Sequence, residues 1–162
     1  MKIEQLITTI EAAFDGVPQP TQRTLHDAEA WDNYSQCSEE DRKKDNIGRW
    51  QNLPIEHIEE CQYALPHLDK TGLRFYLPAY MTWYLKSPNA SGWWVDSTLY
   101  SFDDYSKNPE LSKYHIERFS LFTMDQIRTC ALFVKFCTTD TIINSDSRFA
   151  QEIYDRYWFQ YV

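Results

Sequence analysis

Glycine and long apolar runs are both scarce in this chain. Only 4 of its 162 residues are glycine, so few positions offer the backbone freedom that phosphate-binding loops and nucleophile turns require. The most apolar stretch, residues 73–85, is shorter than the roughly 18 apolar residues of a membrane span. The N-terminal residues also lack the pattern of a signal peptide. We therefore expect a soluble, cytoplasmic protein without common hydrolase or nucleotide-binding motifs.

Cysteine is scarce too, and its four copies are far apart. Positions 37, 61, 130 and 137 lack the close paired spacing of zinc sites and redox dithiols. If Cys130 and Cys137 share a helix, they lie about 10 Å apart along its axis, beyond the reach of a disulfide. We expect reduced thiols, and neither a metal nor a cofactor.

Positive charge is in deficit, with 16 Lys and Arg against 24 Asp and Glu and a net charge of -8. Such a balance argues against binding to nucleic acid or to an anionic membrane, both of which attract clustered Lys and Arg. A basic protein partner is compatible with it. The acidic residues concentrate in residues 27–60, which hold ten of them against four bases. They are Asp27, Glu29, Asp32, Glu39, Glu40, Asp41, Asp45, Glu56, Glu59 and Glu60.

Apolar and aromatic residues are plentiful, at 43% and 16% of the chain. That supply is enough for one sizeable core, and 162 residues is the length of one ordinary domain. No repeat, low-complexity tract or linker divides the chain. We predict a single domain over residues 1–162.

The apolar periodicity predicts an all-α fold. Apolar positions are helically spaced in residues 3–14, 24–35 and 55–65, and Thr123 is placed to cap a further helix. Residues 73–86 are apolar on all sides of a helical wheel, which is typical of a buried element. We predict a compact bundle of about six helices around the aromatic-rich helix 73–86. The alternative is an α+β fold with a short strand near 93–95.

Several shorter segments complete this expectation. The acidic run that starts at Ser38 predicts a short helix, and residues 69–72 predict a turn before the central helix. Pro78 must lie in the first turn of that helix or kink it. Residues 103–112 are a polar connection, and residues 149–161 form a last helix with an aromatic stripe.

The central segment resembles a family of small bacterial domains of unknown function. The resemblance rests on Gly72-Leu73-Arg74-Phe75-Tyr76-Leu77-Pro78-Ala79-Tyr80, which is similar to the family's Gly-Phe-Arg-Tyr-Tyr-Leu-Pro-Ala-Tyr hallmark. Leu73 stands where the family usually has an aromatic residue. The resemblance implies a helical fold and brings no activity and no catalytic residues.

Two groups of residues could carry chemistry. His26, Glu29 and Asp32 step by three residues along a predicted helix and could share a metal, although one histidine at this spacing is less typical of zinc than a solvated polar face is. His57 and Cys61 suggest a nucleophile with its base. On a helix, however, Cys61 belongs to the apolar side and His57 to the polar side. We assign no catalytic residue.

The aromatic residues of the middle segment permit two roles. Core packing is favoured, and a partner-binding or ligand-binding surface is the alternative, because Tyr and Trp are typical interface anchors. The cluster comprises Tyr63, Phe75, Tyr76, Tyr80, Trp83, Tyr84, Trp93 and Trp94.

The leading functional hypothesis is a non-enzymatic acidic binding protein. An immunity protein that neutralises a basic toxin by covering its active site fits this description, since complementary charge speeds association and aromatic anchors slow release. The alternatives are a metal-dependent enzyme using His26, Glu29 and Asp32, and a small-molecule sensor with an aromatic pocket. The sequence does not define an oligomeric state. The residues expected to bind the partner are Asp27, Glu29, Asp32, Glu39, Glu40, Asp41 and Tyr76.

Overall fold

The computed structural model describes residues 1–139 and 145–162. Within these residues the secondary structure is entirely helical, which confirms the all-α prediction. There are nine α-helices and three short 3-10 helices in this part of the chain, more than the six or so expected. They are α1 (Ile3–Ala13), α2 (Leu25–Asp32), α3 (Glu39–Lys44), η1 (Trp50–Asn52), α4 (Ile55–Glu60), η2 (Leu65–His67), α5 (Lys70–Lys86), α6 (Trp93–Tyr100), α7 (Pro109–Phe119), α8 (Met124–Cys137), α9 (Ser147–Arg156) and η3 (Trp158–Tyr161).

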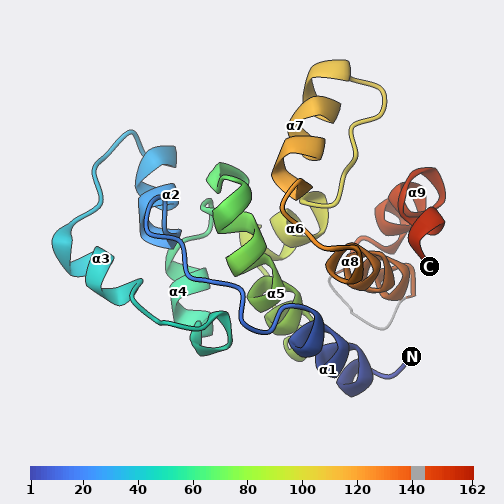
Figure 1. The fold of residues 1–162 in the computed structure, drawn as a ribbon, viewed down its shortest axis with the longest axis horizontal. Coiled ribbons are helices and arrows are strands. Elements are labelled where there is room, and N and C mark those ends of the chain that lie inside the picture. Colours follow the sequence, from blue (N-terminus) through green and yellow to red (C-terminus); the bar gives the residue numbers. More distant parts are fainter. Residues whose placement is uncertain (140–144) are drawn as a thin grey trace.

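Helix α5 is the central element, as the sequence predicted. It lies between the group α2 to α4 and the group α6 to α9, and it packs against α1, α6, α7, η1 and η2 (Figure 1). Phe75, Tyr76, Tyr80 and Tyr84 are buried, and Trp83 is partly buried and packs against the core. The residues of this helix that were candidates for a binding surface therefore belong to the core.

The first turn of α5 corrects a local prediction. Residues 69–72 are not a turn, because Asp69 caps the helix and its Oδ1 accepts the N–H of Gly72 at 2.8 Å. The helix therefore begins at Lys70, and Pro78 lies in its interior. Proline leaves the carbonyl of the preceding turn without its usual helical donor.

Helix α8 follows its local signals closely. Thr123 and Gln126 form a capping box, in which each side chain bonds the backbone N–H of the other. The Gln126 amide is also the meeting point of three helices. Its Nε2 donates to the carbonyl of Ala13 at the end of α1, and its Oε1 accepts from Nε of Arg74 on α5. One buried polar side chain thus joins α1, α5 and α8.

Four boundaries differ from the sequence prediction. Helix α4 ends at Glu60 instead of continuing to 65, and residues 103–112 contain the start of α7. The last helix is interrupted at Tyr157, after which η3 follows. The strand expected near 93–95 is the first turn of α6, so the α+β alternative is wrong.

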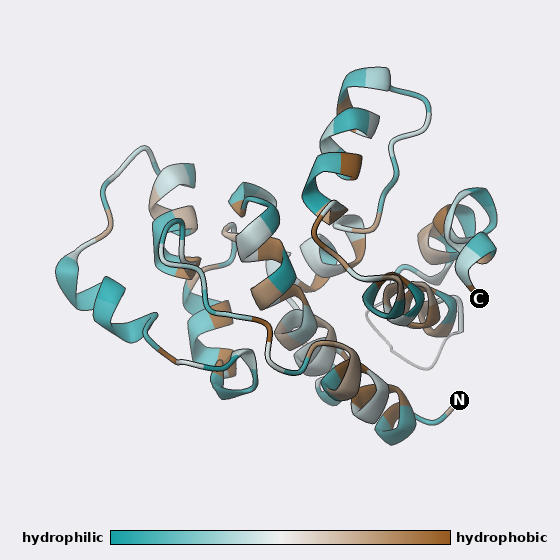
Figure 2. Ribbon diagram, in the orientation of Figure 1, coloured by the Kyte–Doolittle hydropathy of each residue, from teal (hydrophilic) through white to brown (hydrophobic). Residues whose placement is uncertain are grey.

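The buried apolar side chains of the described residues include members of every α-helix except α3. Figure 2 shows α3 as almost wholly hydrophilic, whereas α1 and α8 carry hydrophobic residues along their lengths. A second aromatic group closes the core beside α8, where Phe102 packs against Phe133 and Trp158. Within residues 1–139 and 145–162, no helix combines the length and apolarity needed to cross a lipid bilayer.

The aromatic packing beside α8 gives a stability prediction. Trp158 is fully buried and its Nε1 donates to the carbonyl of Phe102 at 2.7 Å, so Trp158→Ala should lower the free energy of unfolding by about 3–5 kcal/mol. Its neighbour Phe159 is 54% exposed, so Phe159→Ala should cost less than about 1 kcal/mol. Urea denaturation measures both values. Similar losses for the two variants would contradict the placement of η3.

Candidate functional site

A buried polar cluster is centred on His26, at the start of α2. Its Nδ1 lies 2.6 Å from Oδ1 of Asp45, and its Nε2 lies 3.2 Å from Oε2 of Glu60. The backbone N–H of His26 donates to the other oxygen of Asp45 at 2.8 Å. His26 and Asp45 are buried, whereas Glu60 is half exposed and also contacts Lys44 at 3.5 Å. The cluster ties together α2, the end of α3 and the end of α4.

The contact with Asp45 is the main interaction that raises the pKa of the His26 ring. Burial lowers the pKa of an imidazole, but the interactions with Asp45 and Cys61 outweigh it and raise the pKa of His26 from 6.5 to about 11. The hydrogen bond from Nε2 of His26 lowers the pKa of Glu60. As an imidazolium, the ring donates from both nitrogens, so it has no lone pair with which to bind a metal or take a proton.

The predicted metal set does not come together. Each of its three members has a different partner: His26 contacts Asp45 and Glu60, Glu29 accepts the N–H of Tyr63 at 2.9 Å, and Asp32 lies 2.8 Å from Nε2 of His67. No three His, Cys, Asp or Glu residues are arranged to hold a metal ion anywhere in residues 1–139 and 145–162. Three residues are less than one helical turn, so each of these side chains points about 60° away from the one before it.

Cys61 has a histidine neighbour, although not the one considered in the sequence. The His26 ring, and not that of His57, lies close enough to influence its thiol. Burial nevertheless raises the pKa of Cys61, which is 1% exposed. A nucleophile must be accessible and partly ionised, so this arrangement lacks both properties of a reactive cysteine.

The acidic residues expected to bind a partner lie on or beside α2 and α3, and most have an intramolecular contact. Asp27 faces Arg42 at 3.6 Å, Glu39 faces Lys43 at 3.8 Å, and Asp41 faces Lys44 at 3.3 Å. Glu39 is 87% exposed, so such a pair is weak and free to rearrange. Glu40 has no ion pair among the described residues and is exposed. These residues, with Glu29 and Asp32, remain predicted contacts.

Tyr76 has to be removed from that set. Its side chain is 0% exposed, and its hydroxyl accepts the backbone N–H of Leu25 at 3.2 Å. A side chain without accessible area cannot touch a partner. Its role is to satisfy a donor at the start of α2, while burial raises the pKa of its hydroxyl.

An exposed row of aromatic side chains crosses from the end of α4 to α9. We call Tyr63, Trp93, Tyr100 and Phe149 the aromatic row. Ring centroids lie 6.4 Å apart for Tyr63 and Trp93, 6.3 Å for Trp93 and Tyr100, and 5.0 Å for Tyr100 and Phe149. The first three are 47%, 43% and 38% exposed. The row is therefore a contiguous apolar surface and not a set of isolated side chains.

A glycine positions the start of the aromatic row. Gly92 has a φ of +118°, and a Cβ there would approach the amide of Gln62 to 3.0 Å. That amide accepts the N–H of Trp94 at 2.9 Å, which places the first turn of α6 beside Tyr63. Tyr63 and Trp93 were among the aromatic residues predicted from the sequence, whereas Tyr100 and Phe149 were not. A helix over 93–100 would have placed residues 93, 96 and 100 on one face.

The comparisons with known proteins give a family without an activity. The model of the family of unknown function DUF6714 matches residues 2–162. The chain belongs to this family. The expectation of an unknown-function family is thus confirmed, and the match to DUF6714 extends over nearly the whole chain. Neither the curated proteins nor the solved structures include a match.

The His26 cluster predicts a specific pH dependence of stability. Because the pKa of His26 is raised on folding, its contribution to the free energy of unfolding is complete below about pH 6.5 and is lost as the pH rises toward about 11. The stability difference between the wild type and His26→Gln should shrink over this window, by at most about 1.4 kcal/mol per pH unit. Urea denaturation at several pH values measures it.

The control for this experiment is His67→Gln. The His67 ring is 33% exposed beside Asp32, so solvent weakens this contact and its removal should matter less. A stability difference for His26→Gln that does not change between pH 6.5 and 11 would contradict the assignment of a doubly paired imidazolium.

Proposed function

We propose that this chain is a non-enzymatic binding protein whose aromatic row anchors a basic protein partner. The observation that carries this proposal is the exposure of three contacting aromatic rings, Tyr63, Trp93 and Tyr100, on one surface. Aromatic residues are enriched at the centres of interfaces, where they bury large areas with little loss of side-chain entropy. In a protein without such a partner, this surface would remain in contact with water.

Carboxylates beside the row favour a basic partner. Glu29 accepts the backbone N–H of Tyr63, and Asp96 lies on α6 between Trp93 and Tyr100, three and four residues from each. Residues at these spacings are neighbours on a helix surface. The net charge of -8 adds a long-range attraction for a positively charged protein. The acidic residues of α2 and α3 contribute to this negative charge.

The more specific proposal is an immunity protein that neutralises a basic toxin by covering its active site. A toxin that acts on nucleic acid needs a cationic cleft, and an acidic protein with aromatic anchors is complementary to such a cleft. The residues that would contact it are Asp27, Glu29, Asp32, Glu39, Glu40 and Asp41 together with the aromatic row. Growth rescue when the chain is co-expressed with the toxin encoded beside its gene tests this proposal directly.

The metal-dependent enzyme is less well supported by the geometry. His26, Glu29 and Asp32 have separate partners, and the imidazolium of His26 has no free lone pair.

We further propose that the protein is bacterial and cytoplasmic, and that the hallmark of its family is the run Gly72 to Tyr80. This run supplies much of the buried surface of α5. Its Tyr76 is buried and offers no accessible functional group.

Removal of one aromatic anchor should mainly accelerate dissociation. Trp93→Ala should cost about 2 kcal/mol of binding free energy, which is roughly a thirtyfold weaker Kd, because the ring lies in the middle of the row. Surface plasmon resonance with the neighbouring toxin separates the dissociation rate from the association rate. The matched control is Ile116→Ala on α7, which is 63% exposed and lies outside the row. Equal effects of the two variants would argue against the aromatic row as the anchor.

Charge reversal should act on the association rate instead. The variant with Glu39→Lys, Glu40→Lys and Asp41→Lys should associate about tenfold more slowly at low salt, and the difference should narrow as salt screens the charges. A control variant with Glu4→Lys, Glu11→Lys and Glu110→Lys makes the same change in net charge at exposed positions elsewhere. If the two triple variants slow association equally, net charge and not this surface attracts the partner.

A further inference from the structure

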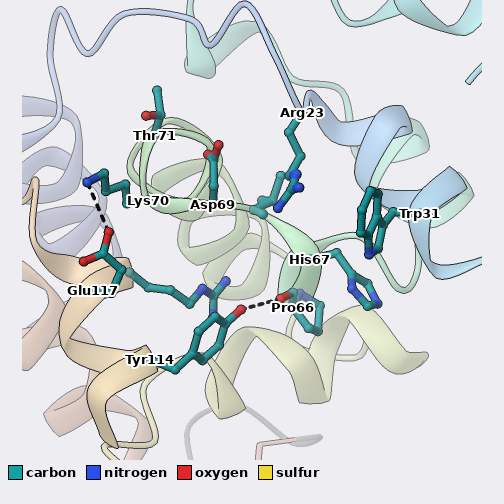
Figure 3. Close-up of a pocket in the computed structure, with 11 residues that line it drawn as sticks. Arg23, Trp31, Pro66, His67, Asp69, Lys70, Thr71, Tyr114 and Glu117 are labelled. Carbon is teal, nitrogen blue, oxygen red and sulfur yellow. Dashed lines mark hydrogen bonds and ion pairs between the residues drawn. The ribbon is translucent and has the colours of Figure 1, made fainter. Parts of the chain in front are cut away.

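A pocket of about 330 Å³ lies at the N-terminal end of α5. Figure 3 shows Arg23 and Trp31 on one side of it and Lys70, Glu117 and Tyr114 on the other. Pro66 and His67 of η2 lie between the two sides. Four separate parts of the chain therefore form the walls: the approach to α2, η2, the first turn of α5, and α7.

Arg118 is the unusual residue of this pocket. Its side chain is 7% exposed, yet it has no carboxylate partner among the described residues. Its Nη2 donates to the carbonyl of Leu65 at 2.8 Å, and its guanidinium lies 5.3 Å from the ring centroid of Tyr114. Its Nε has no hydrogen-bond partner. A buried cation without a counter-ion is costly, so its presence calls for an anion.

Arg23 is a second cation without an anionic partner in the described part of the chain. Its guanidinium lies 4.9 Å from the ring centroid of Trp31, which orients it across the pocket wall. The side chain is exposed, so it is free to turn toward a bound group. Two arginines from distant parts of the sequence thus line one small pocket.

The first turn of α5 adds backbone donors. Asp69 binds the N–H of Gly72 with its side chain and that of Leu73 with its carbonyl. The N–H groups of Lys70 and Thr71 have no hydrogen-bond acceptor within residues 1–139 and 145–162. They are the outermost donors of a helix of 17 residues, where the helix dipole is positive.

The carboxylates that line the pocket are already engaged. Asp69 caps α5, and Glu117 contacts Nζ of Lys70 at 3.1 Å. His67 is likewise paired with Asp32. Arg23 and Arg118 therefore remain as positive charges in excess, although the chain as a whole is strongly acidic. The acidic composition of the chain therefore does not predict the positive charge of this pocket.

We propose that this pocket binds a small phosphate-bearing molecule, with the guanidinium groups of Arg118 and Arg23 and the N-terminal turn of α5 holding the phosphate. Arginine matches the geometry of phosphate oxygens, and free N–H groups at a helix N-terminus bind the same group. The Thr71 hydroxyl is a further donor at the pocket wall. The volume exceeds that of a phosphate ion alone, which leaves room for a small organic substituent beside Trp31.

The test is isothermal titration calorimetry with three probes at constant ionic strength: inorganic phosphate, phenyl phosphate and benzoate. Phosphate and phenyl phosphate should bind saturably at one site, and benzoate should bind more weakly because a carboxylate uses fewer of the donors. Arg23→Gln should weaken phosphate binding about tenfold, since it removes a charge-assisted contact. Arg118→Gln should have at least the same effect.

Two controls keep the result interpretable. Arg148→Gln changes the charge by the same amount at a residue that is 91% exposed on α9 and should leave phosphate binding unchanged. If Arg118→Gln does not fold, Arg23→Gln decides, because that side chain is at the surface. Trp31→Phe should remove any fluorescence change caused by phenyl phosphate.

Three outcomes would overturn the proposal. The first is the absence of saturable binding for inorganic phosphate and phenyl phosphate. The second is equal weakening by Arg23→Gln and Arg148→Gln, which would indicate a general charge effect. The third is tighter binding of benzoate than of both phosphates, which would assign the pocket to carboxylates. None of these outcomes depends on the protein partner of the aromatic row.

Discussion

The enclosure of α5 is the constraint on which the structure depends. A helix that is buried on nearly every face needs apolar neighbours all round, and its polar groups are costly to bury unless they find a partner. Arg74 meets the amide of Gln126, Trp83 donates to the carbonyl of Leu53, and the hydroxyl of Tyr76 accepts from Leu25. Each of these bonds fixes a different neighbour, so α5 organises α8, the approach to α4 and α2 at the same time.

The connection between α4 and α5 brings the two candidate surfaces close in sequence. Tyr63 belongs to the aromatic row, and four residues later His67 lines the pocket at the start of α5. His67 is the last residue of η2, whose Leu65 carbonyl accepts from Arg118. This short segment thus contributes one residue to the aromatic row and others to the cationic pocket. If the aromatic row binds a protein and the pocket binds a small molecule, the two ligands occupy different residues of this segment.

Local signals predicted much of the fold. Thr123 with Gln126 marked the start of α8, and the apolar wheel of residues 73–86 identified α5 as buried. The start of α6 was missed because Trp93, Trp94 and Val95 have strand-like propensities, which the contact between Gln62 and the N–H of Trp94 overrides. The start of α7 was missed because its exposed polar residues resemble those of a polar connection. Asn108 and Pro109, a cap and a first-turn proline, were the signals that could have identified it.

The candidate sites were less predictable, because they depend on contacts across long stretches of sequence. His26 meets Asp45 and Glu60, which lie 19 and 34 residues away, and no periodicity links them. Arg118 is buried where α7 meets η2, and the residues next to it in the sequence do not indicate this burial. The exposure of Trp93 beside the buried Trp94 follows only once the residues are on a helix.

The lack of any buried residue in α3 has a consequence for motion. Helix α3 contributes no apolar contact to the core, so it is held by polar contacts alone, chiefly those of Asp45 and Lys44 at its end. Detachment of such an element exposes little apolar area and leaves the bundle intact. Amide hydrogens in this segment should exchange with solvent through local opening, far faster than those of α5, which wait for the whole domain to unfold.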